Sequence, residues 1–278
     1  MINQSIIILQ GIGFHYPKSN HFSLQSLTMT IPKSRITALL GPNGSGKTTL
    51  LLLLLGWLKP QQGSIQIDGC DPAVTPRCKM SRVIGLVPQN ETYPLGLTVL
   101  QYLLLGRAPY LGLLGSPGGG DRRIAQAAIA AVGLEGFKNR PITSLSGGER
   151  QLATIARAIV QEPRILLMDE PTAHLDLANK HRVMETINRL VEQEVTVMLT
   201  THDPNVAAEV ADEAVLLRGG RLVAFGPTPQ VLTEENLSLT YNLPVLVTEV
   251  WGRPVVLLHS EMSACREVVQ AGRAEDGN

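Results

Sequence analysis

The chain has 278 residues, 44% of them hydrophobic, which is enough to bury a substantial core as one large domain or two closely packed subdomains. Its 24 lysines and arginines balance its 24 aspartates and glutamates, so no global basic field suggests a nucleic-acid partner, and none is expected. The cysteines, Cys70, Cys78 and Cys265, have no metal-site spacing and indicate free thiols in a reducing, cytoplasmic compartment.

Neither a secretion signal nor a membrane span is expected. Residues 1–5 have no positively charged start and no long apolar run behind them. The most apolar stretch, residues 50–58, is far shorter than the roughly 20 residues that a spanning helix needs. If this protein works at a membrane, another chain must provide the channel.

The first third of the chain predicts strands on both sides of a glycine-rich loop. Apolar runs at 6–9 and 27–31, and again at 64–67, have the short connections of an antiparallel sheet that flanks a core. Residues 36–40 form another apolar run, and the loop and a leucine-rich segment at 49–58 follow it directly. The order is therefore strand, loop, helix.

The loop itself has the spacing of a phosphate-binding loop, in which small residues let backbone N–H groups close around the β- and γ-phosphates of a nucleotide. Lys47 would reach those phosphates as a compact cation, Thr48 would ligate Mg²⁺ and Thr49 would support the phosphates. A glycine turn with a surface lysine is the alternative, and the full eight-residue match disfavours it. The nucleotide-binding residues expected here are Gly41, Pro42, Asn43, Gly44, Ser45, Gly46, Lys47, Thr48 and Thr49.

Between residues 89 and 145 the sequence changes to a helical insertion. A glycine- and proline-rich break at 115–120 precedes Asp121, which we expect to cap an alanine-rich helix that ends near Gly133. The insertion is bracketed by strand patterns, so it predicts a separate helical layer.

Four apolar runs alternate with helical patterns, which predicts an α/β fold with a mainly parallel sheet covered on both faces. They lie at 83–87, 165–168, 196–200 and 214–217. Gly219 and Gly220 then separate two strand-like segments and indicate a hairpin. Beyond residue 244 a short strand-like pair surrounds 252–254, and we expect the polar tail at 271–278 to fray.

Two carboxylates, Asp169 and Glu170, end the predicted strand at 165–168, where open α/β sheets bind ligands. Asp169 would hold Mg²⁺, and Glu170 would act as general base on the attacking water. The alternative is that they only end the strand and cap the next helix.

A second loop, residues 145–151, places Ser146, Gly147 and Gly148 before a helix that begins near Glu149. Two glycines and a hydroxyl there can present N–H groups and a helix dipole to a phosphate. A simple N-cap at Ser146 is the alternative, and both can hold because the cap aims these groups outward.

These motifs together resemble the ATP-binding-cassette (ABC) family, and the resemblance covers most of residues 1–240. It implies a P-loop nucleotide-binding core with a flanking antiparallel sheet at 1–89 and 161–240, a helical signature subdomain at 90–160, and a C-terminal extension at 241–278. In that family the 145–151 signature caps ATP held by the other subunit. The resemblance therefore implies ATP and Mg²⁺ as ligands and a second copy of this chain as partner.

The resemblance also assigns roles that the residues alone do not. Gln89 corresponds to the family's glutamine that contacts Mg²⁺ and water, and His202 to the switch histidine that contacts the γ-phosphate and orients Glu170. Tyr16 corresponds to the aromatic residue that stacks on adenine, with Phe14 as the competing candidate. The resemblance thus implies catalytic residues Glu170, His202 and Gln89, and Mg²⁺ ligands Thr48, Gln89 and Asp169.

One cassette without a membrane segment resembles the separate ATPase subunit of an uptake transporter. It implies a peripheral location at the cytoplasmic face of the inner membrane, membrane-spanning permease subunits as partners and, indirectly, an extracytoplasmic substrate-binding protein. Residues 103–112 resemble the iron-chelate branch, which imports ferric siderophores, haem or vitamin B12. Internal packing is the alternative for this segment, but its glycines and proline favour an exposed connection.

Two other functions are kept as alternatives. A soluble ABC-type clamp could use the same ATP-driven closure for regulation or nucleic-acid handling, without a membrane partner. A nucleotide-binding module without useful hydrolysis is the other, and the intact set of Lys47, Asp169, Glu170 and His202 argues against it.

Overall fold

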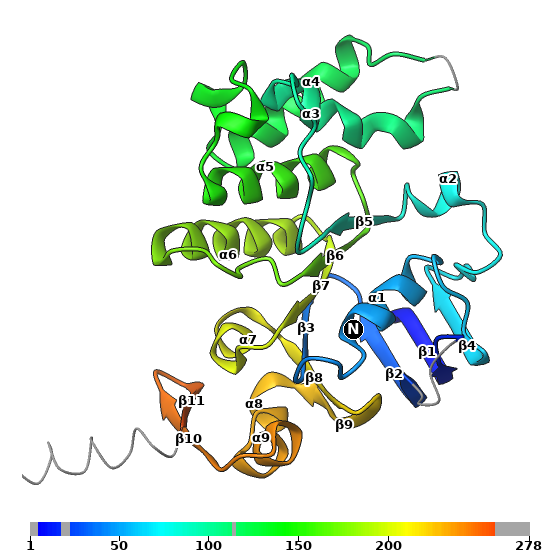
Figure 1. The fold of residues 1–278 in the computed structure, drawn as a ribbon, viewed down its shortest axis with the longest axis vertical. Helices are drawn as coiled ribbons and strands as arrows, with labels where there is room; N and C mark the ends of the chain where they lie inside the picture. The colour runs from blue at the N-terminus through cyan, green and yellow to red at the C-terminus, as the bar shows by residue number, and fades with distance from the viewer. Residues whose placement is uncertain (1–4, 18–22, 113–114, 259–278) are drawn as a thin grey trace, which may run out of the picture.

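A six-stranded, mainly parallel sheet forms the centre of the computed structural model, which describes residues 5–17, 23–112 and 115–258 (Figure 1). Its strand order is β5-β6-β7-β3-β8-β9, and neighbouring strands are parallel except β8 and β9, which form the hairpin predicted at Gly219 and Gly220. The strand bounds are β3 Ile36–Leu40, β5 Ile84–Val87, β6 Ile165–Asp169, β7 Thr196–Thr201, β8 Glu213–Arg218 and β9 Arg221–Pro227.

Each face of this sheet belongs to a different hydrophobic core, because consecutive side chains of a strand point to opposite faces. In β3, Ala38 and Leu40 pack in one core and Leu39 packs in the other. In β6, Leu166 packs in the first of these cores and Leu167 packs in the second. The uninterrupted apolar runs of the sequence are therefore explained by strands that are buried on both faces.

The helix that follows the phosphate-binding loop lies between two sheets. α1 (Lys47–Leu54) buries its leucines in the core that also contains strands of the central sheet and of the antiparallel sheet β2-β1-β4. The bounds of that second sheet are β1 Ser5–Phe14, β2 Leu24–Pro32 and β4 Gln62–Ile67. The expected flanking antiparallel sheet is present, although the helix predicted to reach residue 58 ends at Leu54, before the left-handed Gly56.

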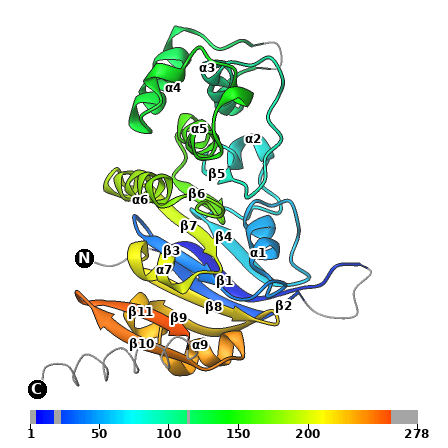
Figure 2. The same ribbon diagram turned by 60° about the vertical axis from the view of Figure 1, so that its left-hand side comes forward.

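A layer of helices lies beyond β5 and β6, on the side of the molecule away from the antiparallel sheet β2-β1-β4 (Figures 1 and 2). Among them, α3, α4 and α5 pack on one another, and α6 lies between α5 and the sheet. The bounds are α2 Arg77–Met80, α3 Val99–Leu104, the 3-10 helix η1 Leu105–Tyr110, α4 Gly119–Ala131, η2 Glu135–Phe137, η3 Ile142–Ser144, α5 Gly147–Val160 and α6 Leu177–Glu192.

The prediction that Asp121 is the N-cap of the alanine-rich helix is wrong by three positions. The N-cap of α4 is Gly118, and Asp121 is the third helical residue. Its carboxylate accepts a hydrogen bond from the Gly118 N–H at 2.9 Å and an ion pair from Arg107 at 2.8 Å. The acidic residue therefore stabilises the first turn from inside the helix, which also suits the helix dipole.

The remaining elements lie on the side of the molecule away from α3, α4 and α5, where α7 packs on β3, β7 and β11 (Figure 2). They are α7 Pro204–Val210, α8 Thr228–Val231, α9 Glu234–Tyr241 and the antiparallel hairpin β10 Val245–Val250 with β11 Arg253–Leu258. This hairpin confirms the strand pair expected around 252–254, while the predicted polar tail at 271–278 and Cys265 lie outside the described residues. Cys70 and Cys78 are free thiols. Within the described ranges, no helix has both the length and the apolar character that crossing a bilayer requires.

Candidate functional site

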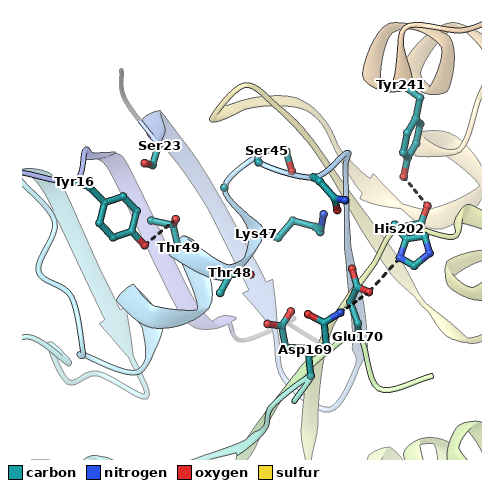
Figure 3. A pocket seen from close by; sticks show the side chains of 14 residues that line it. Tyr16, Ser23, Ser45, Lys47, Thr48, Thr49, Asp169, Glu170, His202 and Tyr241 are labelled. Atoms are coloured by element: carbon teal, nitrogen blue, oxygen red, sulfur yellow. Dashed lines mark hydrogen bonds and ion pairs between the residues drawn. The ribbon is translucent and has the colours of Figure 1, made fainter. Parts of the chain in front are cut away.

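A cavity of about 770 Å³ opens beside the N-terminus of α1, at the carboxyl ends of β6 and β7 (Figure 3). It brings together segments that are far apart in the sequence, because parallel strands end at the same edge of a sheet. We call it the nucleotide pocket. Its lining residues are Tyr16, Ser23, Asn43, Gly44, Ser45, Gly46, Lys47, Thr48, Thr49, Gln89, Asp169, Glu170, His202 and Tyr241.

The phosphate-binding loop can follow its path only because its first residue is a glycine. Gly41 has φ 150° and lies against β8, so a Cβ atom there would be 2.2 Å from the carbonyl oxygen of Leu217. A side chain would also lie 2.6 Å from the Ser45 hydroxyl. Gly41 and its neighbour Pro42 set the path of the loop and do not line the pocket themselves.

Lys47 is a buried cation inside this loop, so the alternative of a surface lysine is wrong. It is the first residue of α1 and only 7% exposed. Its Nζ donates hydrogen bonds to the carbonyl oxygens of Gly41 at 2.6 Å and Pro42 at 3.2 Å. Burial lowers the pKa of Lys47, and the carboxylates of Glu170 and Asp169 act in the opposite direction. The ammonium group is thus held inside the loop by backbone carbonyl oxygens.

The residues of the pocket fit a phosphate group and Mg²⁺. The Ser45 hydroxyl is buried and has no hydrogen-bond partner among the described residues. The hydroxyl of Thr48, the carboxylate of Asp169 and the amide of Gln89 all line the same pocket, and Mg²⁺ prefers such oxygen ligands. The described residues contain no cluster of three or more His, Cys, Asp or Glu side chains suited to a metal.

Asp169 and Glu170 are linked through Thr200 on the neighbouring strand β7. The Thr200 hydroxyl donates to Asp169 Oδ1 at 2.5 Å and accepts from the Glu170 N–H at 3.0 Å. Glu170 has φ 47°, which turns the chain sharply after β6. The next helix, α6, is capped by Asp176, so the alternative that this carboxylate pair caps it is wrong.

Gln89 and His202 both contact one oxygen of Glu170, as Figure 3 shows. Gln89 Nε2 donates to Glu170 Oε2 at 3.1 Å, and His202 Nδ1 lies 3.2 Å from the same atom. The Glu170 side chain is 13% exposed, whereas the His202 side chain is 62% exposed. A carboxylate held from two sides is fixed in orientation, while the imidazole remains accessible from the pocket.

The choice between the two aromatic residues near residue 15 is decided by burial. Phe14 is 5% exposed and belongs to the hydrophobic core, whereas Tyr16 is 40% exposed and lines the pocket. The Tyr16 ring packs edge-on against Phe14 with centroids 5.1 Å apart, and its hydroxyl lies 3.4 Å from the Thr49 hydroxyl. Of the two rings, only that of Tyr16 can offer a face to a base.

The signature loop lies at the N-terminus of α5 and is not part of the nucleotide pocket of its own chain. Ser146 is the N-cap: its hydroxyl accepts from the Glu149 N–H, and Glu149 accepts from the Ser146 N–H at 2.7 Å. The helix begins at Gly147, two residues before the predicted start. Ser146 and Gly147 are exposed and Gly148 is buried. The N-cap alternative is therefore correct, and an exposed loop remains in front of a 14-residue helix.

A family model described as "ABC transporter" matches residues 24–173, more than half of the chain. The chain belongs to the ABC transporter family. Its fold is that of solved ABC ATPase domains: it superimposes on an inward-facing metal-chelate type ABC transporter with a TM-score of 0.80, at 35% identity over 91% of this chain and 96% of the other.

Curated relatives of this ABC protein agree with the resemblance to chelate importers. A probable iron chelatin transport ATP-binding protein of Helicobacter pylori is 35% identical, over 86% of this chain and 94% of the relative. The molybdate import ATP-binding protein of Haemophilus influenzae is 39% identical, over 85% of this chain and 88% of the relative. The expected membership of the ABC ATPases is confirmed, and the chain is an ATPase of this family.

A second cavity of this ABC protein lies between the central sheet and the helical layer, and we call it the Trp57 groove. The segment resembling the iron-chelate branch forms one wall through Leu105, Ala108 and Pro109. The remaining lining residues are Leu55, Trp57, Arg77, Cys78, Met80, Ser81, Ile84, Leu86, Pro88, Gly106, Arg157, Ala158 and Gln161.

The expectation that this segment is an exposed connection is only partly correct. Leu105 is 47% exposed, but Arg107 is 6% exposed and pairs with Asp121 and Glu162. Gly106 packs so closely on α5 that a Cβ would lie 2.3 Å from the Arg157 carbonyl oxygen. Internal packing fixes one side of the segment, and the other side faces the groove.

Three residues in or beside the pocket of this ABC protein escaped the sequence analysis. Ser23 lines the pocket beside the phosphate-binding loop, Thr200 joins Asp169 to Glu170, and Tyr241 reaches the pocket from α9. The strand that contains Thr200 was predicted, and its threonines after an apolar run were the available signal. Nothing in the local sequence around Ser23 or Tyr241 indicates a pocket residue.

Proposed function

We propose that this ABC protein is the ATP-hydrolysing subunit of a membrane importer, and that two copies of it enclose two ATP molecules. The observation that carries this proposal is the Glu170 carboxylate, held by Gln89 and His202 at the edge of a phosphate-binding pocket. A module that only binds nucleotide has no need of such an oriented base.

The positions of these side chains support a task in hydrolysis for each of them. Lys47 would bind the β- and γ-phosphates, and Thr48, Gln89 and Asp169 would hold Mg²⁺, which supplies neutralisation of phosphate charge when bound. Glu170 would take the proton of the attacking water as general base.

Two further side chains would orient the general base and the nucleotide. His202, 62% exposed in the pocket, would contact the γ-phosphate and keep Glu170 aligned. Tyr16 would stack on adenine at the far end of the pocket.

The proposal of a second copy is supported by the signature loop, which does not line the pocket of its own chain. In a dimer, Ser146 and Gly147 of one copy would face the γ-phosphate held by the other. The exposed end of α5 supplies N–H groups and the positive end of a helix dipole for that contact.

A mixing experiment tests this arrangement. Lys47→Ala inactivates the phosphate-binding loop and Ser146→Arg blocks the signature, so each variant alone should hydrolyse ATP at least 100-fold more slowly than the wild type. A mixed dimer contains one pocket with both parts intact, and an equimolar mixture should regain roughly a quarter of wild-type turnover on statistical mixing. A mixture as inactive as its components would contradict the shared site.

The Trp57 groove supports a membrane-spanning partner. It has a volume of about 730 Å³ and an apolar wall that includes Leu55, Trp57, Leu86 and Leu105. An apolar segment of a permease subunit would fit there, as in helix-in-groove recognition. Such docking would place this chain peripherally at the cytoplasmic face of the cell membrane, in contact with the permease. Through the permease it would act indirectly with an extracytoplasmic binding protein.

Iron chelates are the cargo we propose first, because the segment at 103–112 and a relative named for iron chelatin transport agree. Molybdate is the second candidate, since a molybdate import protein shares 39% identity. ATP turnover of the complete transporter in vesicles, measured with ferric siderophore, haem, cobalamin or molybdate, tests the cargo. We expect ferric siderophore to stimulate it most, and stimulation by none of them would favour the soluble clamp.

A further inference from the structure

The hydroxyl of Tyr241 enters the nucleotide pocket from α9, a helix that no motif of the sequence connects with the nucleotide. It donates to the backbone carbonyl oxygen of His202 at 3.3 Å, as Figure 3 shows. One side chain from the C-terminal region thus holds the main chain of the residue that contacts Glu170.

The Tyr241 hydroxyl is protonated at physiological pH, and burial favours this form further. The pKa of Tyr241 is raised to about 12, with burial as the largest cause and the N–H of Gly41 acting in the opposite direction. Tyr241 therefore remains a neutral hydrogen-bond donor throughout the physiological range.

The end of α9 is fixed, so the hydroxyl is fixed as well. Arg218, the last residue of β8, donates to the carbonyl oxygen of Leu239 and to Asn242 Oδ1. Asn242 ends the helix in the left-handed conformation, with φ 57°. The position of Tyr241 is consequently set by the central sheet through β8.

The chain after His202 is held by the same C-terminal region. Asn205 donates to the Val256 carbonyl oxygen at 3.1 Å and accepts from the Val256 N–H at 2.8 Å. Arg253 donates to the carbonyl oxygen of Glu209 at 2.6 Å. Tyr241 contacts His202, two residues before α7, and β11 contacts α7 itself, so the C-terminal elements hold both sides of this turn.

We propose that Tyr241 is a positioning residue for ATP hydrolysis, which fixes the main chain of His202 so that its imidazole faces Glu170. This inference rests on the proposed function, because it assumes that His202 and Glu170 act in hydrolysis. It assigns a role in turnover to the C-terminal helix, which lies outside the residues matched by the family model.

Tyr241→Phe tests the proposal, since it removes the hydroxyl and keeps the ring. A single hydrogen bond of this kind corresponds to roughly a threefold to tenfold effect, which we expect as a fall in kcat for ATP. The KM for ATP should change less than about twofold, because the hydroxyl contacts main chain and not the nucleotide-binding side chains.

Thr240→Val is the matched control. Thr240, the neighbouring residue of α9, donates its hydroxyl to the Asn236 carbonyl oxygen at 2.7 Å and does not line the pocket. Both variants lose one hydroxyl-to-carbonyl bond of the same helix, and thermal melting checks that both are folded. Thr240→Val should keep wild-type turnover, so an equal loss in both would reduce Tyr241 to a structural role and overturn the proposal.

A double-mutant cycle shows whether Tyr241 acts through His202. In a His202→Ala background, Tyr241→Phe should cause no further loss of the residual kcat, and a full, independent loss would overturn the proposal. The proposed function and the role of Tyr241 can be contradicted by different results. No ATP hydrolysis by the folded wild-type chain would contradict the proposed function, whereas normal turnover of Tyr241→Phe contradicts only the role of Tyr241.

Discussion

The nucleotide pocket and the Trp57 groove have similar volumes, about 770 and 730 Å³, and walls of opposite character. The pocket is formed by a glycine-rich loop, a buried lysine and carboxylates at strand ends. The groove is formed largely by apolar side chains, with Trp57 55% exposed and Leu105 47% exposed. The polar cavity suits an anion and its chemistry, and the apolar one suits another chain, because exposed apolar surface is stabilised by being covered.

The two cavities meet at consecutive residues after β5. Pro88 lines the groove and Gln89 lines the pocket, where it contacts Glu170. The nucleotide pocket and the groove that we propose for docking thus differ in composition but are lined by neighbouring residues of one short connection.

The largest expected effect comes from replacing Glu170, the proposed general base. Glu170→Gln should lower ATP turnover by about 100-fold to 10,000-fold, because an amide cannot accept the proton of water as a carboxylate does. ATP binding should persist, since Lys47 and the loop are intact, and dimers should accumulate in the presence of ATP. Steady-state hydrolysis with size-exclusion chromatography measures both, and undiminished turnover would remove Glu170 from its role.

An intermediate effect is expected in the groove. Trp57→Ala should reduce the partner-dependent stimulation of turnover by about tenfold or more, as is usual for a central aromatic at an interface. Hydrolysis by the chain alone should stay within about twofold of wild type. If basal hydrolysis fell equally, the distinction between groove and pocket would be lost.

The second tryptophan of the chain provides the control for this test. Trp251, in the turn between β10 and β11, is 99% exposed and does not line the groove. Trp251→Ala should change neither basal nor stimulated turnover. Equal losses in both variants, measured in the reconstituted transporter, would mean that the groove is not the docking surface.

The smallest effect is expected at the rim of the pocket. Tyr16→Ala should raise the KM for ATP about tenfold with little change in kcat, because base–aromatic stacking contributes roughly 1 to 3 kcal/mol to binding. Tyr16→Phe keeps the ring and loses only the contact with the Thr49 hydroxyl, so it should bind ATP nearly as the wild type does. A similar KM in all three proteins, from initial-rate kinetics, would exclude stacking on this ring.

Much of the fold was predictable because its signals are local. The strands β3 and β6 are short apolar runs whose alternate residues enter different cores, and the hairpin after β8 is marked by two glycines. Helix ends were less predictable. Asp121 was placed at the cap of α4 but stabilises the first turn from the third position, because the preceding glycines can also adopt the cap conformation.

The sequence by itself determined the chemistry: a phosphate-binding loop, an acidic pair after an apolar strand and a signature before a helix, since each motif lies within a few adjacent residues. Only the tertiary structure decided what lies beside them. It brought Gln89 and His202 onto one oxygen of Glu170, buried Phe14 while leaving Tyr16 in the pocket, and added Tyr241 from the end of the chain. Such contacts depend on how distant elements pack, and a long-range contact leaves no spacing in the sequence by which it can be recognised.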